Sequence, residues 1–123
     1  MNKVKILLAE DSATILEIIK SQLQRLNYEV ITAMDGKEAL TKAAETKPDL
    51  ILMDIVMPDM DGIEATTRLK RDENLKTIPI LMLTAQDEES NVQKSINAGA
   101  DDYIIKPVNP AMLRQKINKS LKK

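Results

Sequence analysis

The sequence predicts an α/β protein built on a doubly wound, five-stranded parallel sheet with helices on both faces. Three observations indicate this fold class. Short apolar runs rich in β-branched residues alternate with longer segments of helical periodicity, which is typical of βαβ units. The apolar runs are nearly continuous, as expected of strands that are buried on both sides. Turn residues separate these runs from the helical segments.

The first predicted strand is Val4–Ala9, which contains the continuous apolar run Ile6-Leu7-Leu8. A helix is predicted at 13–26, because the apolar residues of this segment recur at about 100° per residue and therefore form one stripe. That stripe consists of Ile15, Leu16, Ile19, Leu23 and Leu26.

The second and third strands are predicted at Glu29–Ala33 and Leu50–Asp54, on either side of a helix at 36–46. The turn residues Asp35-Gly36 precede this helix, and Lys47-Pro48-Asp49 separates it from the third strand. The third run is apolar up to its final aspartate, which is typical of a strand that is covered on both faces.

The second half of the chain continues the alternation. Helices are predicted at 63–72, 89–98 and 110–121, and strands at Pro79–Thr84 and Tyr103–Ile105. Asn97-Ala98-Gly99 marks the end of one helix. Asn109-Pro110 marks the start of the next, with asparagine as the N-cap and proline in the first helical position.

Five βα units in 123 residues are typical of a flavodoxin-like (βα)5 fold, in which the strand order is 2-1-3-4-5. That order is taken from known folds of this class, since the succession of elements does not determine it. The length is that of one domain, and no repeat, linker or low-complexity stretch divides the chain. Residues 1–123 are therefore predicted to form a single domain.

The composition argues against several classes of function. A net charge of −1 argues against broad attraction to nucleic acid or to an anionic membrane. The absence of cysteine and histidine excludes disulfides, zinc sites with these ligands and a histidine-based triad within the chain. The longest apolar run, Ile78–Leu83, is too short to cross a bilayer, and no signal-peptide pattern follows Met1. We therefore expect a soluble cytoplasmic protein that does not act on a membrane.

Polar side chains occur at the predicted carboxyl ends of four strands. They are Glu10 and Asp11 after the first strand, Asp54 and Thr84 at the ends of the third and fourth, and Lys106 after the fifth. Ligands of an open α/β sheet bind beside the carboxyl ends of its strands. We therefore expect these five side chains to converge at one edge of the sheet.

Three carboxylates held close together repel one another and favour a bound hard cation, for which Mg²⁺ suits a small cluster of oxygen ligands. A carboxylate can also attack phosphorus and form an aspartyl phosphate. Phosphoryl transfer then needs cations and donors around the phosphoryl oxygens, which Lys106 and Thr84 would supply with the metal. Acidic residues at strand ends are also common in ordinary loops, and a lone Lys-Pro is usually a surface turn. The hypothesis therefore depends on all five residues occurring together.

The chain resembles the receiver domains of bacterial two-component systems over essentially its whole length, 1–123. The matching stretches are Leu7–Asp11, Asp35–Leu40, Pro48–Asp54, Met57–Gly62, Pro79–Ala85, Ala98–Tyr103 and Ile104–Pro107. The resemblance implies a phosphorylation-dependent signalling switch that is not a conventional enzyme beyond catalysing its own phosphorylation and dephosphorylation. Its expected partners are a histidine kinase or histidine phosphotransfer protein and an unidentified downstream protein, with no nucleic acid bound by this chain.

The resemblance also implies a Mg²⁺ site. Asp11 and Asp54 are the expected direct ligands, Glu10 would bind the ion directly or through water, and Val56 would contribute its backbone carbonyl. Glutamate at position 10, in place of a second aspartate, is a common variant in this family.

The same resemblance assigns the phosphoryl chemistry and the switch. Asp54 would be the phosphoacceptor, and Thr84 and Lys106 would hold the phosphoryl oxygens. Tyr103 would be the aromatic residue that changes orientation with Thr84, although a half-buried strand tyrosine is the alternative. The peptide bond between Lys106 and Pro107 is expected to be cis.

Ile18 is a candidate docking contact for the kinase. By helical angle it lies beside the buried stripe of the 13–26 helix, so we expect it to be half-exposed near Glu10 and Asp11. In the family this helix contacts the kinase. Packing at the edge of the core is the alternative interpretation of the same position.

Two other functions are alternatives to the phosphorylation-dependent switch. An interaction module that works without phosphate would be expected to have lost a site residue, and all of them are present. A phosphohydrolase of the haloacid dehalogenase type would need an aspartate two residues after Asp54, where this chain has Val56. Because no output domain follows the last helix, we expect a stand-alone regulator, with a fragment of a longer protein as the alternative.

Overall fold

The computed structural model describes residues 3–85 and 89–122 and confirms the predicted fold class. Five strands form one sheet in the order β2-β1-β3-β4-β5, and every neighbouring pair is parallel. The strands are β1 (Lys5–Ala9), β2 (Glu29–Ala33), β3 (Leu50–Asp54), β4 (Ile80–Thr84) and β5 (Asp102–Ile105). The strand order is the one expected of a (βα)5 fold.

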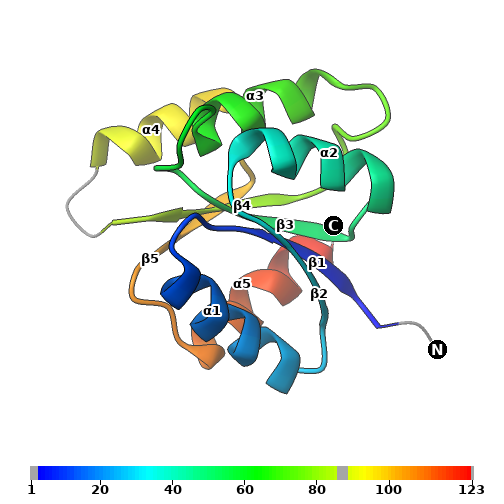
Figure 1. Ribbon diagram of the computed structural model, residues 1–123, viewed down its shortest axis with the longest axis vertical. Coiled ribbons are helices and arrows are strands. Elements are labelled where there is room, and N and C mark those ends of the chain that lie inside the picture. The colour runs from blue at the N-terminus through cyan, green and yellow to red at the C-terminus, as the bar shows by residue number, and fades with distance from the viewer. Residues whose placement is uncertain (1–2, 86–88, 123) are drawn as a thin grey trace.

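The five helices cover the sheet in two layers. They are α1 (Ala13–Arg25), α2 (Gly36–Thr46), α3 (Gly62–Arg71), α4 (Glu89–Ala98) and α5 (Pro110–Leu121). Figure 1 shows α2, α3 and α4 on one face of the sheet and α1 and α5 on the other. None of the helices in the described part of the chain is long and apolar enough to span a membrane.

The element bounds differ from the predicted ones by no more than one residue, and local chemistry explains the differences. β4 begins at Ile80 because Pro79 has no N–H group to donate to a neighbouring strand. α3 begins at Gly62, one residue earlier than predicted, because Asp61 is the N-cap and its side chain accepts a hydrogen bond from the backbone of Glu64 at 2.8 Å.

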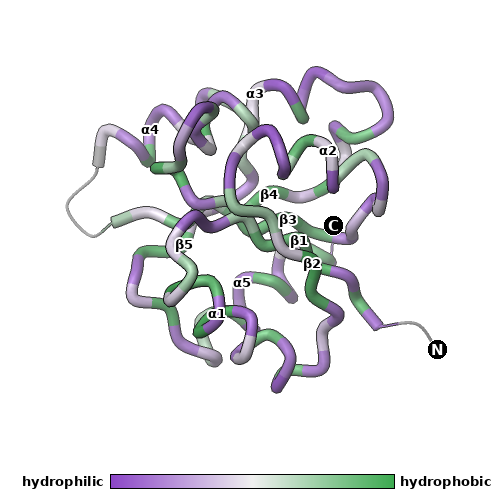
Figure 2. The backbone as a smooth tube through the Cα atoms, in the orientation of Figure 1, coloured by the Kyte–Doolittle hydropathy of each residue, from purple (hydrophilic) through white to green (hydrophobic). Residues whose placement is uncertain are grey.

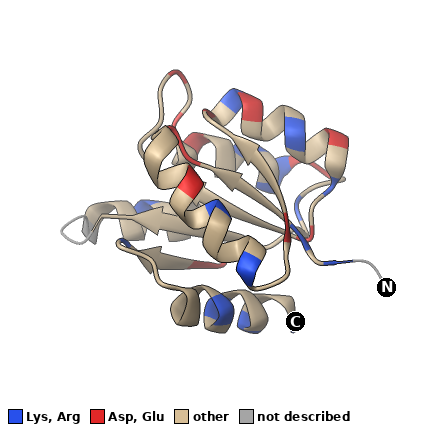
Figure 3. Cartoon of the chain, turned by 60° about the horizontal axis from the view of Figure 1, so that its bottom comes forward, with Lys and Arg blue, Asp and Glu red and all other residues tan. Residues whose placement is uncertain are grey.

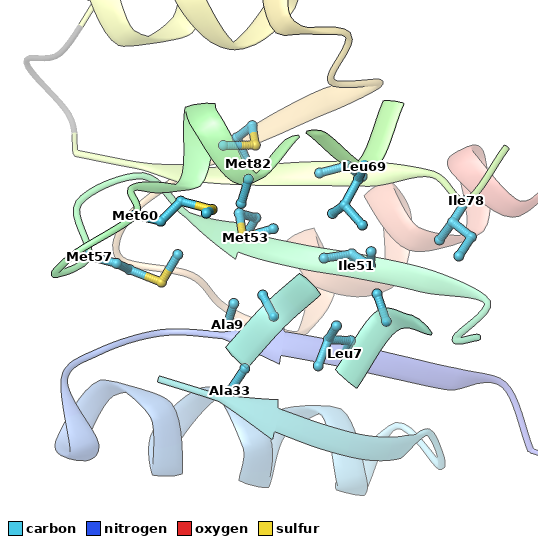
Figure 4. Close-up of a cluster of buried hydrophobic side chains, with 14 of the residues drawn as sticks. Leu7, Ala9, Ala33, Ile51, Met53, Met57, Met60, Leu69, Ile78 and Met82 are labelled. Atoms are coloured by element: carbon cyan, nitrogen blue, oxygen red, sulfur yellow. The ribbon is translucent and has the colours of Figure 1, made fainter. Parts of the chain in front are cut away.

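Each face of the sheet buries its own apolar cluster. On the α1 and α5 side, Leu16, Ile19 and Leu23 of the predicted helical stripe are buried, while Ile15 and Leu26 pack at its edge. The cluster on the α2 and α3 side is rich in methionine and is drawn in Figure 4; it includes Met53, Met57, Met60 and Met82. Unbranched methionine side chains fill irregular space in a core that has no phenylalanine or tryptophan.

The hydropathy of the chain follows this layering. Figure 2 shows the strands at the centre of the molecule as mainly hydrophobic, while hydrophilic residues are frequent along the helices around them. All five residues of β3 and of β4 are buried, so both strands are covered on both faces. Because all strands are parallel, their carboxyl ends share one edge, where any site built on strand ends must lie.

Candidate functional site

The register of the sheet places the predicted site residues next to one another. Ala9 of β1 pairs with Met53 of β3. Glu10, the residue after β1, therefore lies next to Asp54, the last residue of β3. Thr84, at the end of β4, pairs with Ile105 of β5. The backbone N–H of Lys106 donates to the Thr84 carbonyl at 2.8 Å, which fixes the loop after β5 beside β4.

Three carboxylates form a cluster at this edge. Oxygen atoms of Glu10, Asp11 and Asp54 all lie within 4.8 Å of one another. Glu10 is 1% exposed and Asp54 is 5% exposed, whereas Asp11 is open to solvent. Two acidic side chains are therefore withdrawn from water, and the third lies at the opening.

Lys106 neutralises part of this charge. Its Nζ donates hydrogen bonds at 3.0 Å to Oε1 of Glu10 and at 3.0 Å to Oδ1 of Asp54. The peptide bond between Lys106 and Pro107 is cis, as the resemblance implies. One ammonium group thus faces three carboxylates, so the cluster retains a negative excess that favours a cation.

Burial sets the acidity of the central carboxylate. It raises the pKa of Asp54 from 3.8 to about 7, with the Lys106 hydrogen bond opposing the rise and the charge of Glu10 adding to it. For Lys106, burial alone would lower the pKa, but the hydrogen bonds to Glu10 and Asp54 outweigh it and raise the pKa. Lys106 therefore stays charged at neutral pH, while Asp54 is poised between its two forms.

The turns that leave the strands support these positions. Ser12 is the N-cap of α1, and its backbone N–H donates to Oε2 of Glu10 at 3.1 Å. The N–H of Gly62 donates to the carbonyl of Ile55 at 2.8 Å. A Cβ atom at position 62 would overlap the carbonyl oxygen of Asp54, so only glycine allows α3 to start this close to the site.

A cavity of about 280 Å³ opens at this edge of the sheet. Its lining includes all six residues predicted for metal binding and phosphoryl transfer: Glu10, Asp11, Asp54, Val56, Thr84 and Lys106. Val56 is 67% exposed, so its side chain does not form part of the core. The cavity has room for a phosphoryl group beside Asp54.

Tyr103 and Ile18 lie outside this cavity. Tyr103 is half-buried on β5, opposite Met82 of β4, and packs against the methionine-rich cluster. Ile18 is 52% exposed, as predicted, and lines a separate groove of about 340 Å³. Lys106 also lines that groove, so the exposed face of α1 adjoins the candidate site.

Sequence reasoning missed Ser12, Asn91 and Lys116. Ser12 could have been found, because a serine just before a helical stripe is an N-cap signal. Asn91 lines the cavity from α4, far along the chain, and no local pattern marks it. Lys116 lies on α5 with its Nζ 5.4 Å from the centre of the Tyr103 ring, a contact that depends on tertiary packing.

The donor set fits a hard divalent cation. It consists of carboxylate oxygens with a negative excess, and one of them, on Asp11, is accessible from solvent. Mg²⁺ binds through one or two carboxylates and keeps several waters, which suits a cluster that opens into a cavity.

Comparisons with known proteins give one consistent result. The family described as the response regulator receiver domain matches residues 6–118. The alkaline phosphatase synthesis transcriptional regulatory protein PhoP of Bacillus subtilis is 43% identical over 123 residues, which is 100% of this chain and 50% of that protein. The chain thus spans about half the length of the curated relatives it matches.

Solved structures agree with this result. A putative response regulator from Chloroflexus aurantiacus has a TM-score of 0.96 at 34% identity, over 99% of this chain and 100% of that one. The receiver domain of a sensor histidine kinase from Pseudomonas aeruginosa has a TM-score of 0.93 at 32% identity, over 99% and 100% of the two chains. That structure has a magnesium ion coordinated in its active-site cleft.

Proposed function

The chain belongs to the response regulator receiver domain family, and on this premise we propose that Asp54 is its phosphoacceptor. Receiver domains are regulators of two-component signalling and not conventional enzymes, so the function of this one is that of a phosphorylation-dependent switch. Asp54 ends the central strand of the sheet and lines the cavity, in contact with Lys106.

The transfer joins a carboxylate oxygen of Asp54 to phosphorus while the bond from phosphorus to a histidine nitrogen of the donor breaks. That nitrogen leaves with the electron pair of the broken bond. Lys106 already contacts Asp54 and stays charged, so its ammonium group can follow the developing charge onto the phosphoryl oxygens. Thr84 lines the same cavity and offers a hydroxyl donor.

Asp11, Asp54, Glu10 and the backbone carbonyl of Val56 are the groups proposed to hold Mg²⁺. When bound, the ion would supply positive charge that neutralises the developing charge on the phosphoryl oxygens. The carboxylate of Asp11 is exposed and can receive the ion from solvent. Lys106 keeps Glu10 and Asp54 oriented through two hydrogen bonds.

Lys106 and Thr84 would also assist phosphoryl transfer from small phosphodonors and the hydrolysis of the aspartyl phosphate by water. Because Lys106 and Thr84 line the same cavity as Asp54, we infer that the domain promotes its own phosphorylation by acetyl phosphate. Water that enters the cavity would hydrolyse the aspartyl phosphate, which restores the Asp54 carboxylate and releases inorganic phosphate. A phosphohydrolase with a second catalytic aspartate is disfavoured, because position 56 is valine.

The proposed output is a change around Thr84 and Tyr103. A phosphoryl group on Asp54 adds acceptor oxygens beside the Thr84 hydroxyl, and a hydrogen bond there would draw Thr84 towards the site. Tyr103 lies on the neighbouring strand and could then enter the space that Thr84 leaves. The surface of α4, β5 and α5 would change for a downstream protein partner.

The proposed donor is a histidine kinase or a histidine phosphotransfer protein, with which receiver domains interact. A cytoplasmic location is proposed with this assignment. PhoP of Bacillus subtilis, which is similar to this chain over half of its own length, is a transcriptional regulatory protein.

The observation that carries the proposal is the convergence of Asp54, Lys106 and Thr84 on one cavity with an acidic cluster. Acetyl phosphate with MgCl₂ should add one phosphoryl group to the protein, seen by intact mass, and borohydride trapping should locate it at Asp54. Asp54→Asn should remove the label, while Asp49→Asn, which alters an aspartate outside the cavity, should keep it. Equal labelling of Asp54→Asn would refute the assignment.

A further inference from the structure

The ammonium group of Lys116 lies against the ring of Tyr103. Its Nζ is 5.4 Å from the ring centre, within the distance of about 6 Å at which a cation is attracted to an aromatic ring. Lys116 belongs to α5, on one side of the sheet, whereas Tyr103 packs into the methionine-rich cluster on the other side. The contact is possible because β5 is an edge strand, so the lysine side chain can reach around it.

Asp102 fixes this ammonium group in place. Its two carboxylate oxygens each accept a hydrogen bond from Lys116 Nζ at 3.1 Å, and the two side chains are only 19% and 26% exposed. Figure 3 shows basic and no acidic residues along α5, so the counter-charge comes from β5. Asp102 Oδ1 also accepts a hydrogen bond from the backbone N–H of Tyr103 at 2.8 Å. One carboxylate thus holds both the backbone of Tyr103 and the cation beside its ring.

We propose that Lys116 is a positioning residue. It holds the Tyr103 ring in the position that the ring has while Asp54 is unphosphorylated and in contact with Lys106. This inference rests on the proposed function, in which the Tyr103 ring moves when Asp54 is phosphorylated. A ring that moves must leave Lys116, so the contact opposes switching. Lys116 therefore sets the fraction of the protein that occupies the switched state at a given phosphoryl occupancy.

If Lys116 and Asp102 had a purely structural role, a different result would be expected. An ion pair between Lys116 and Asp102 that only joins α5 to β5 would stabilise both arrangements of Tyr103 equally. Its loss would lower the melting temperature without changing the affinity for a phosphoryl mimic, because a contact made equally in two states shifts no equilibrium between them.

The test measures beryllofluoride affinity, since beryllofluoride with Mg²⁺ mimics the aspartyl phosphate. Lys116→Met keeps most of the apolar stem and removes the ammonium group. It should bind beryllofluoride about two- to fivefold more tightly than the unaltered protein, as expected for a lost cation–aromatic contact. Lys119→Met, which alters an exposed lysine of the same helix, is the matched control and should leave the affinity unchanged. Lys116→Arg should restore it.

A double-mutant cycle tests whether the effect of Lys116 on beryllofluoride affinity depends on the Tyr103 ring. In a Tyr103→Leu background the Lys116→Met change should no longer alter beryllofluoride affinity, because the partner of the cation is gone. Persistence of the full effect without the ring would overturn the proposal. An affinity of Lys116→Met equal to that of Lys119→Met would overturn it as well. If instead the unaltered protein does not bind beryllofluoride, the failure lies with Asp54 as phosphoacceptor and with the proposed function itself.

Discussion

The Nζ of Lys106 lies 3.0 Å from Oδ1 of Asp54, so the proposed nucleophile and the cation that would assist it are already in contact. The two residues reach this position from the ends of β3 and β5, which are separated by β4 in the sheet. The contact has consequences for stability, pH response and metal binding, as well as for chemistry.

Lys106→Met should destabilise the protein at pH 8. Removal of the ammonium group takes one hydrogen-bond donor from each of the buried carboxylates of Glu10 and Asp54, at a cost of about 1–3 kcal/mol. Urea unfolding in EDTA measures this difference. It should shrink at pH 5, where Asp54 is protonated, and an equal loss at both pH values would contradict the role of the ion pair. Lys119→Met, which removes an exposed ammonium group away from the site, is the comparison variant.

The stability of the protein in EDTA should fall as the pH rises from about 4 to about 7. Burial raises the pKa of Asp54 from 3.8 to about 7, so in this range the folded protein keeps a proton that the unfolded chain has lost. The stabilisation is fully present below the unfolded pKa and is lost as the pH rises through the folded pKa. The slope from this one group cannot exceed about 1.4 kcal/mol per pH unit.

Asp54→Asn is the control for this pH dependence, because it keeps the shape of the side chain and does not titrate. Urea unfolding at pH 5, 6, 7 and 8 should give a flatter profile for this variant than for the unaltered protein. Parallel profiles would mean that Asp54 does not titrate in this range.

MgCl₂ should raise the melting temperature. The ion binds the clustered carboxylates of the folded state and stabilises it by about 2.7 kcal/mol at a concentration one hundred times its Kd. Asp11→Asn should reduce the shift, because Asp11 is the exposed member of the cluster. Glu17→Gln, which alters an exposed acid on α1 outside the cluster, should leave the shift intact. No shift for the unaltered protein at millimolar Mg²⁺ would exclude the proposed metal site.

Ile18→Ala should slow phosphotransfer from the cognate kinase about tenfold and leave labelling by acetyl phosphate unchanged. The side chain is exposed beside a groove that Lys106 also lines, so it can contact a partner without contributing to the chemistry. Ile96→Ala is a matched control, since both isoleucines are 52% exposed and Ile96 lies on α4. If labelling by kinase and by acetyl phosphate falls together, Ile18 acts in packing and not in docking.

The sequence was sufficient to predict those parts of the site that depend on strand ends. A parallel sheet brings the carboxyl ends of its strands to one edge, so Asp54, Thr84 and Lys106 could be placed together once the strands were identified. The fold class and the element bounds were predictable for a similar reason, because continuous apolar runs and helical stripes are local patterns.

Contacts between elements far apart in the chain were not predictable in this way. Asn91 reaches the cavity because of how α4 packs, and the contact of Lys116 with Tyr103 depends on the position of α5 at the sheet edge. The pKa of Asp54 likewise follows from burial that only the folded chain produces. The strand order does not follow from the sequence alone, because the succession of βα units is compatible with more than one order.

The two tyrosines of this chain lie on opposite sides of the sheet. Tyr28 packs with the cluster under α1 and α5, and Tyr103 packs with the methionine-rich cluster on the other side. Because the chain has no tryptophan, all intrinsic emission arises from these two side chains. A Tyr28→Leu variant would therefore have a single natural fluorophore, Tyr103, located on the edge strand β5. Its anisotropy and quenching would report ring motion at β5 without any attached dye.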